Sequence, residues 1–284
     1  MTLPAMVAAV QAVDFHVRDR HDSFITVAGE RRGYVFHRPP ALDTARRAPL
    51  VIVLHGGALW GAAMRDITGW NALADREGFL VAYPSGQGWW PRSWPAWHGD
   101  DRAPDVEFIE RLIDTLVARH GADRDRVYVN GLSNGGGMSF ALSCDIPERI
   151  AAIGVVSGAL PAWTGCTTRV PMPVMVIHGT ADPTAFYHGG TSWVVHHPFP
   201  PVTSWVAQWG ERNRCSGARD TVMEPRVSVR TYTGCADGAE VRLITLHGDG
   251  HVWPGGALIP EWFAGTDSRA LDATAELWRF FRDK

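Results

Sequence analysis

The fold of this chain is decided by residues 127–147, which read VYVNGLSNGGGMSFALSCDIP. The β-branched and aromatic run at residues 127–129 is typical of a strand. After a break at residues 131–135, a helical pattern runs to Pro147. Between them, GLSNG at residues 131–135 fits the G-x-S-x-G pattern, in which a serine occupies a strained turn from strand to helix. Small residues must flank such a turn because strand and helix crowd together there. We therefore interpret Ser133 as a candidate nucleophile; the alternative is a glycine-rich loop with a surface serine.

Upstream, residues 50–54 (LVIVL) form a continuous apolar run, as expected of a strand that is buried on both faces of a parallel sheet. The run ends in His-Gly-Gly-Ala. Acyl transfer needs two amide donors aimed at the developing oxyanion, one directly after the nucleophile and one from an early strand-to-helix loop. The backbone amides of Asn134 and Gly57 are the candidates, with Ala58 close behind; the alternative is an ordinary turn. We interpret His55 as a structural histidine that anchors this loop.

Downstream, two further apolar runs each lead into a loop that carries a candidate catalytic residue. The run at residues 174–177 precedes HGTADP, where Asp182 takes the position of a triad acid, although an Asp before Pro is also a common turn residue. The run at residues 240–246 precedes HGDGHVWPGG, whose glycines let the backbone bend and bring His251 to the serine as a general base. His247 is the rival base, but it directly follows the strand, where we expect it to be packed.

The rest of the chain alternates strand and helix patterns without a break in composition. We expect a hairpin from residues 24–27 and 32–37, strands at 79–83, 150–156 and 227–232, and helices at 62–77, 105–120, 202–213 and 268–281. The alternation predicts an α/β protein with a mainly parallel central sheet flanked by helices on both faces. The order Ser133, Asp182, His251 is that of the α/β-hydrolase fold. We expect an N-terminal extension at residues 1–22 and one catalytic domain at residues 23–284.

Composition and motifs argue against several classes of function. The net charge is −3 over 284 residues and no basic stripe appears, which argues against a nucleic-acid binder. No Gly-Lys-Ser/Thr follows the glycines, so a phosphate-binding loop is not favoured. Residues 1–13 are mostly apolar but too short to span a bilayer, and they lack the Lys or Arg that opens a secretory signal. Export after removal of a leader and retention in the cytoplasm both stay open, as does the oligomeric state.

Four cysteines, at positions 144, 166, 215 and 235, allow three pairings. We favour two local disulfides, Cys144–Cys166 and Cys215–Cys235, because each pair brackets a segment between expected elements; four reduced thiols are the alternative. Each disulfide would stabilise the fold by about 3 kcal/mol. The chain has no C-x-x-C motif, so a zinc site is not expected.

Thirteen tryptophans are unusual for a chain of this length. Four lie in the irregular segment 84–104, namely Trp89, Trp90, Trp94 and Trp97. Aromatic side chains in a loop either cover the domain surface or line a binding cleft. We interpret Trp89 and Trp90 as substrate-binding cleft residues. Trp253, two residues after the candidate base, is a third candidate for substrate contact, with core filling as the alternative.

Taken together, four motifs resemble those of the LpqC-type esterases, which are grouped with polyhydroxybutyrate depolymerases and bacterial feruloyl and acetylxylan esterases. The motifs are HGG, GLSNGG, HGTADP and GDGHVWPGG, and the resemblance runs from about residue 24 to the carboxyl terminus. It implies Ser133 as nucleophile, Asp182 as acid, His251 as base, paired cysteines, and export of many relatives. The sequence shows no Thr/Ser-rich linker or polymer-binding module of the kind that many extracellular depolymerases carry.

The expected activity is ester hydrolysis through an acyl-enzyme. His251 takes the proton of Ser133, the serine attacks the ester carbonyl, and Asp182 orients the imidazole; no metal or organic cofactor is needed. The expected substrates, small or polymeric, are feruloyl or acetyl esters of plant cell walls and short polyesters of the 3-hydroxybutyrate type. The alternatives are a serine peptidase of the same fold and a non-catalytic polymer- or carbohydrate-binding protein, and the latter predicts a missing triad member.

Overall fold

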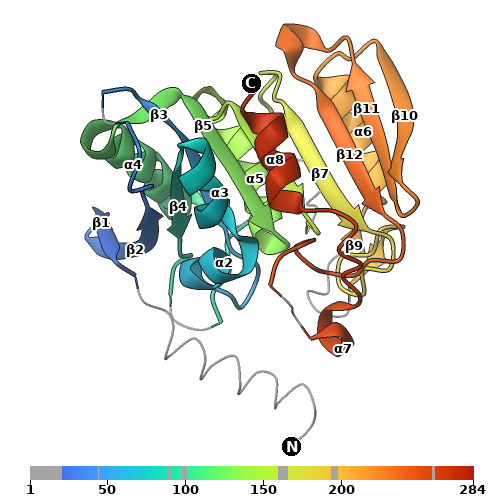
Figure 1. Cartoon of the computed structure of the whole chain (residues 1–284), viewed down its shortest axis with the longest axis horizontal. Helices are drawn as coiled ribbons and strands as arrows, with labels where there is room; N and C mark the ends of the chain where they lie inside the picture. Colours follow the sequence, from blue (N-terminus) through green and yellow to red (C-terminus); the bar gives the residue numbers. More distant parts are fainter. Residues whose placement is uncertain are drawn as a thin grey trace, which may run out of the picture.

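A ten-stranded sheet organises the part of the chain that the computed structural model describes, namely residues 21–43, 45–88, 91–97, 101–158, 166–192, 198–257 and 260–284 (Figure 1). The strand order is β1-β2-β4-β3-β5-β6-β7-β12-β11-β10. Six neighbouring strands are parallel: β4 (Leu80–Pro84), β3 (Ala48–Leu54), β5 (Ala122–Leu132), β6 (Ala152–Val156), β7 (Val174–Gly179) and β12 (Val241–Leu246). The predicted mainly parallel sheet is therefore confirmed.

An antiparallel hairpin completes each edge of the sheet. The expected hairpin is β1 (Ser23–Val27) with β2 (Glu30–His37), and β2 pairs antiparallel with β4. At the other edge, β11 (Val227–Thr233) pairs antiparallel with β12 and with β10 (Gly217–Glu224). β10 was not predicted because all eight of its residues are exposed, so its sequence has no apolar face from which to recognise a strand.

Helices cover both faces of the sheet, as predicted. One buried cluster contains side chains from α4 (Ala103–His120), α5 (Asn134–Asp145) and α6 (Val202–Arg212). The other contains side chains from α2 (Gly61–Thr68), α3 (Trp70–Glu77) and α8 (Ala273–Phe281), and Figure 1 shows α3 and α8 in front of the sheet. β3 explains the division: Leu50, Ile52 and Leu54 enter the first cluster, whereas the alternate Val51 and Val53 enter the second.

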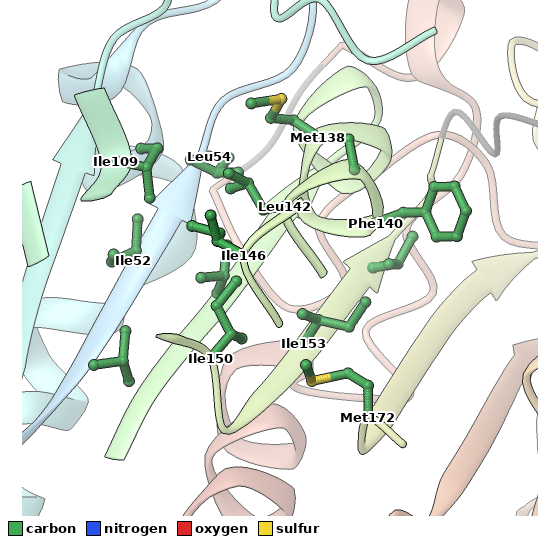
Figure 2. Close-up of a cluster of buried hydrophobic side chains, with 14 of the residues drawn as sticks. Ile52, Leu54, Ile109, Met138, Phe140, Leu142, Ile146, Ile150, Ile153 and Met172 are labelled. Atoms are coloured by element: carbon green, nitrogen blue, oxygen red, sulfur yellow. The ribbon is translucent and has the colours of Figure 1, made fainter. Parts of the chain in front are cut away.

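The helix after the candidate nucleophile, α5, is buried on nearly all sides and is fixed by the packing of its apolar side chains. Figure 2 shows Met138 and Leu142 of α5 in one cluster with Leu54 of β3 and Ile109 of α4. Each of these four side chains is fully buried. The first turns of α5 pack against the end of β3. The turn that precedes α5 and the loop that follows β3 are therefore held by the same close-packed core.

Two predicted helices differ from the structure in extent. The helix expected at residues 62–77 is two helices, α2 and α3, because Gly69 has a left-handed backbone (φ 73°) that interrupts the helical path. The helix expected from residue 268 begins at Ala273, where Asp272 caps it by accepting a hydrogen bond from the amide of Ala275. The short elements α7 (Glu261–Ala264), β8 (Gly190–Thr191) and β9 (Pro198–Phe199) were also not predicted.

Both predicted disulfides are present. Cys144–Cys166 joins the end of α5 to the loop before β7, and Cys215–Cys235 joins the start of the β10–β11 hairpin to its end. Residues 1–20 of the expected N-terminal extension lie outside the described residues. Among the helices that the structure does describe, none is both long enough and apolar enough to cross a bilayer.

Candidate active site

Ser133 lies in the strained turn that the sequence predicts. It connects β5 to α5 with φ 54° and ψ −117°, a backbone conformation that L-residues rarely adopt. A Cβ added to Gly131 would lie 2.3 Å from the carbonyl carbon of Gly135, and one added to Gly135 would lie 2.4 Å from the carbonyl oxygen of Leu54. Both glycines are therefore required by close packing of strand, helix and β3, and the turn holds Ser133 half-buried at the carboxyl end of β5.

The structure brings Asp182 and His251 into direct contact. Asp182 follows β7 and His251 follows β12, and these strands are hydrogen-bonded parallel neighbours, so their carboxyl ends coincide. The distance from His251 Nδ1 to Asp182 Oδ2 is 2.8 Å. The amide of Ala181 also donates to the carbonyl of Asp249, and this contact joins the acid loop to the base loop. Nδ1 of His251 thus carries the proton toward the carboxylate, which leaves Nε2 as the acceptor.

The environment of Asp182 favours its ionised form. The side chain is fully buried, and burial alone would oppose ionisation. The charge of His251 and hydrogen bonds from His178 and His251 outweigh this effect and hold the pKa of the carboxyl well below its ordinary value. The other oxygen, Oδ1, accepts the amides of Thr184 and Ala185, each at 2.8 Å. The carboxylate is therefore charged and fixed in orientation at neutral pH.

Strand β6 connects the serine to the base loop. The amide of Ser133 donates to the carbonyl of Val156, the last residue of β6. The next residue, Ser157, donates its hydroxyl to the carbonyl of Val252, beside His251, at 2.9 Å. Ser157 is buried and has a left-handed backbone (φ 45°). Sequence reasoning missed it because a serine after a strand carries no distinctive signal.

The two candidate oxyanion donors lie on adjacent loops. A Cβ added to Gly57 would lie 4.0 Å from the Cβ of Asn134, so the loop after β3 passes directly by the start of α5. Ala58 is a poorer donor candidate than Gly57, because its amide already donates to the carbonyl of Arg92 at 2.7 Å. Within the described residues, the amide of Gly57 has no such acceptor. Asn134 opens α5, so its amide has no partner within the helix.

His55 is a structural histidine, as its sequence position predicts. It is completely buried; Nε2 accepts the amide of Gly86 at 2.9 Å, and Nδ1 donates to the carbonyl of Gly56 at 2.8 Å. Both ring nitrogens are used, so only the neutral ring fits. Burial lowers the pKa of His55 to about 3, and the hydrogen bond to Gly56 opposes this only in part.

Acidification should destabilise the protein through His55. Its pKa is about 3 in the folded state, whereas an unfolded histidine has a pKa of about 6.5. Below about pH 6.5 the unfolded chain binds a proton that the native ring does not, so the free energy of unfolding falls by up to about 1.4 kcal/mol per pH unit. Urea denaturation at pH 7, 6, 5 and 4.5 measures this slope.

His55→Gln should reduce that slope by the same amount, because glutamine keeps an acceptor for the Gly86 amide but takes up no proton. His188→Gln, at an exposed histidine, is the matched control for the His-to-Gln change itself. Equal slopes for wild type and His55→Gln would contradict the prediction.

A second buried histidine, His178, also contacts the candidate acid. Its Nε2 donates to the carbonyl of Ala185 at 2.7 Å and lies 3.3 Å from Asp182 Oδ2. Sequence reasoning assigned no role to His178, although it opens the HGTADP motif. His247, by contrast, is exposed and bonds Ser228 on β11, so the expectation that it is packed was wrong. Its ring bonds a residue of β11, whereas the histidines that contact Asp182 are His178 and His251.

The interpretation of Trp253 as a substrate contact is corrected by the structure. Its side chain is 2% exposed, packs in the cluster beneath α8 and donates Nε1 to the hydroxyl of Thr274 at 2.9 Å. The residue follows the base in sequence, but its backbone turns the ring into the core. Trp89 and Trp90 lie outside the described residues. Trp94 is buried, and Trp97 is half-buried against Phe199 and Ala185.

The known proteins that this chain resembles in sequence are esterases and a polyester depolymerase. The profile of the Esterase PHB depolymerase family matches residues 32–208. The putative esterase NocK of Nocardia uniformis subsp. tsuyamanensis is 32% identical over 90% of this chain and 81% of its own length. Feruloyl esterase B of Piromyces equi is 29% identical over 75% of this chain, and poly(3-hydroxyalkanoate) depolymerase C of Paucimonas lemoignei is 32% identical over 54%. The chain spans only 41% and 37% of the lengths of these last two relatives.

Solved structures support the fold. An acetyl xylan esterase from Aspergillus awamori has a TM-score of 0.61 at 17% identity, with 89% of this chain and 94% of that chain covered. The thermophilic esterase Est2 of Thermogutta terrifontis has a TM-score of 0.57 at 14% identity, with 91% of each chain covered. With the strand order above, these similarities show an α/β-hydrolase fold.

Proposed function

Because the chain belongs to the Esterase PHB depolymerase family and is a carboxylic ester hydrolase, we propose that Ser133, His251 and Asp182 are its catalytic triad. The observation that carries the proposal is the 2.8 Å contact between His251 Nδ1 and Asp182 Oδ2, at the carboxyl ends of the parallel strands, where the strained Ser133 also lies. That contact sets the tautomer in which Nε2 is free to accept a proton.

In the proposed reaction, His251 Nε2 takes the proton of the Ser133 hydroxyl as Oγ bonds to the ester carbonyl carbon. The amides of Gly57 and Asn134 bind the resulting oxyanion. The carbon–oxygen bond to the leaving alcohol then breaks, and His251 gives that alcohol its proton. A water molecule repeats the sequence on the acyl-enzyme, which releases the acid and restores Ser133. Asp182 stays ionised throughout, in agreement with its low pKa, and stabilises the imidazolium.

For the substrate class, we propose feruloyl or acetyl esters of plant cell walls or short polyesters of the 3-hydroxybutyrate type. The activities named for the relatives support this choice. So does Trp97, which packs 5.6 Å from the ring of Phe199 and against Ala185, whose amide donates to Asp182. An aromatic side chain so close to the acid suits a flat acyl group. The two disulfides support export, because such bonds persist in oxidising compartments.

A substrate panel tests this proposal. We expect hydrolysis of p-nitrophenyl butyrate and of at least one of methyl ferulate, acetylated xylan and 3-hydroxybutyrate oligomers. Trp97→Ala should raise KM for methyl ferulate more than for p-nitrophenyl acetate, since only the former carries an aromatic ring in its acyl group. Faster cleavage of peptide substrates than of all these esters would favour the peptidase alternative. Failure of a fluorophosphonate probe to label the wild-type protein would contradict a serine hydrolase mechanism.

A further inference from the structure

The side chain of Asn134 clamps the backbone of Trp94. Its Oδ1 accepts the amide of Trp94 at 2.6 Å, and its Nδ2 donates to the carbonyl of the same residue at 3.0 Å. The amide group of Asn134 therefore forms a two-bond pair like that between adjacent strands. As a result, the residue after the nucleophile holds a segment that lies forty positions earlier in the chain.

The indole of Trp94 reaches the other candidate oxyanion loop. Nε1 donates to the carbonyl of His55 at 3.0 Å, and the ring lies 4.9 Å from the imidazole of His55. Two residues earlier, the carbonyl of Arg92 accepts the amide of Ala58 at 2.7 Å. Trp94 is 2% exposed, so the bond from its indole to the His55 carbonyl is shielded from water. One segment thus contacts the loop before Gly57, the residue after Gly57, and Asn134.

We propose that Trp94 is a positioning residue that sets the spacing between the two oxyanion amides, an inference that rests on the triad mechanism above. The amides of Gly57 and Asn134 belong to different loops, and Gly56-Gly57 has wide backbone freedom unless neighbouring contacts restrict it. Trp94 restricts this backbone freedom through hydrogen bonds to the carbonyl of His55 on one side and to the side chain of Asn134 on the other. We call these contacts the brace. Neutral His55 completes the brace by accepting the Gly86 amide and bonding Gly56.

The brace acts on the transition state rather than on substrate binding. Preorganised amides are most effective at the developing oxyanion, because they need no reorganisation as charge appears. If the brace is loosened, the amides no longer converge on one point, and the oxyanion loses stabilisation that the neutral ester never had. Such a change lowers kcat with little change in KM.

Trp94→Phe tests the inference, because it keeps a buried aromatic ring and removes the bond to the His55 carbonyl; the Trp70→Phe control loses the same ring volume. We expect kcat for p-nitrophenyl butyrate to fall about tenfold, as for the loss of one hydrogen bond, with KM within about twofold. The inhibition constant of a boronic acid, which mimics the tetrahedral intermediate, should rise by a similar factor. Trp70→Phe is the matched control: Trp70 is also fully buried but lies in the cluster on the opposite face.

A double-mutant cycle adds a second readout. Asn134→Ala keeps the backbone amide but removes both bonds to Trp94. Because Asn134 and Trp94 act through one brace, the double variant should lose less activity than the product of the two single losses. Unchanged kcat in Trp94→Phe, or a higher KM with unchanged boronic acid affinity, would overturn the inference. If Ser133→Ala is inactive in the same assays, the triad stands even then; if Ser133→Ala stays active, the proposed mechanism fails first.

Discussion

Ser133→Ala is expected to lower kcat for p-nitrophenyl butyrate by about 10⁴-fold or more, to the level set by the oxyanion site alone. The reason is geometric. The strained turn, with φ 54° at Ser133, presents this hydroxyl at the end of β5, and the two flanking glycines leave the room that the turn needs. A fluorophosphonate probe should label the wild-type protein at Ser133 and leave the variant unlabelled. Activity of the variant within tenfold of wild type would reject the nucleophile assignment.

Two further variants separate catalysis from folding. Ser139→Ala removes a buried hydroxyl on the same helix, which donates to the carbonyl of Gly135, and it should keep nearly full activity. Ser133→Gly should be as inactive as Ser133→Ala. It should also raise the free energy of unfolding by about 1 kcal/mol, because glycine adopts a positive φ without strain. Thermal unfolding of the variants, beside their esterase assays, distinguishes a strained functional turn from a turn that is needed only for the fold.

Asp182→Asn is expected to lower kcat by about 10⁴-fold while the fold persists. Oδ1 of Asp182 accepts two amides, from Thr184 and Ala185, so an asparagine keeps its carbonyl oxygen there. Its NH₂ group then replaces Oδ2 and faces Nδ1 of His251. Facing an NH₂ donor, Nδ1 of His251 can only accept a hydrogen bond, so the proton of the neutral imidazole moves to Nε2. Nε2 then can no longer accept the serine proton. Steady-state kinetics with p-nitrophenyl butyrate measures the loss.

Asp249→Asn is the matched control for this variant. Asp249 is also a buried carboxylate, two residues before the base, but its Oδ2 accepts the amide and hydroxyl of Ser268 rather than a histidine. It should therefore affect stability more than kcat. Equal losses of activity in both variants would show that the base loop needs any buried carboxylate to fold, and that Asp182 has no specific role in setting the tautomer.

Features that leave a pattern in consecutive residues could be predicted from the sequence, and features that depend on contacts between distant residues could not. The elbow at Ser133 was recognisable because its G-x-S-x-G pattern lies within five consecutive residues, although the packing that requires Gly135 comes from Leu54 of β3. Buried strands such as β3 were recognisable because both of their faces are apolar. β10 was not, because backbone pairing with β11 holds this fully exposed strand and leaves no side-chain pattern. Trp253 was misread for a related reason: nearness to His251 in the chain says nothing about which way the ring turns.

The sequence only favoured the disulfide pairing that the structure contains. By itself it determined the fold class and the order in which a serine, an acid and a histidine follow buried strands. These depend on local backbone preference and on hydrophobic periodicity, both of which are written along the chain. Only the tertiary structure decided that His251 bonds Asp182, that the amide of Ala58 is already used by the carbonyl of Arg92, and that Trp94 links His55 to Asn134. Each of these joins residues far apart in sequence. Their geometry depends on how the packed sheet places loop against loop, to within a fraction of an ångström.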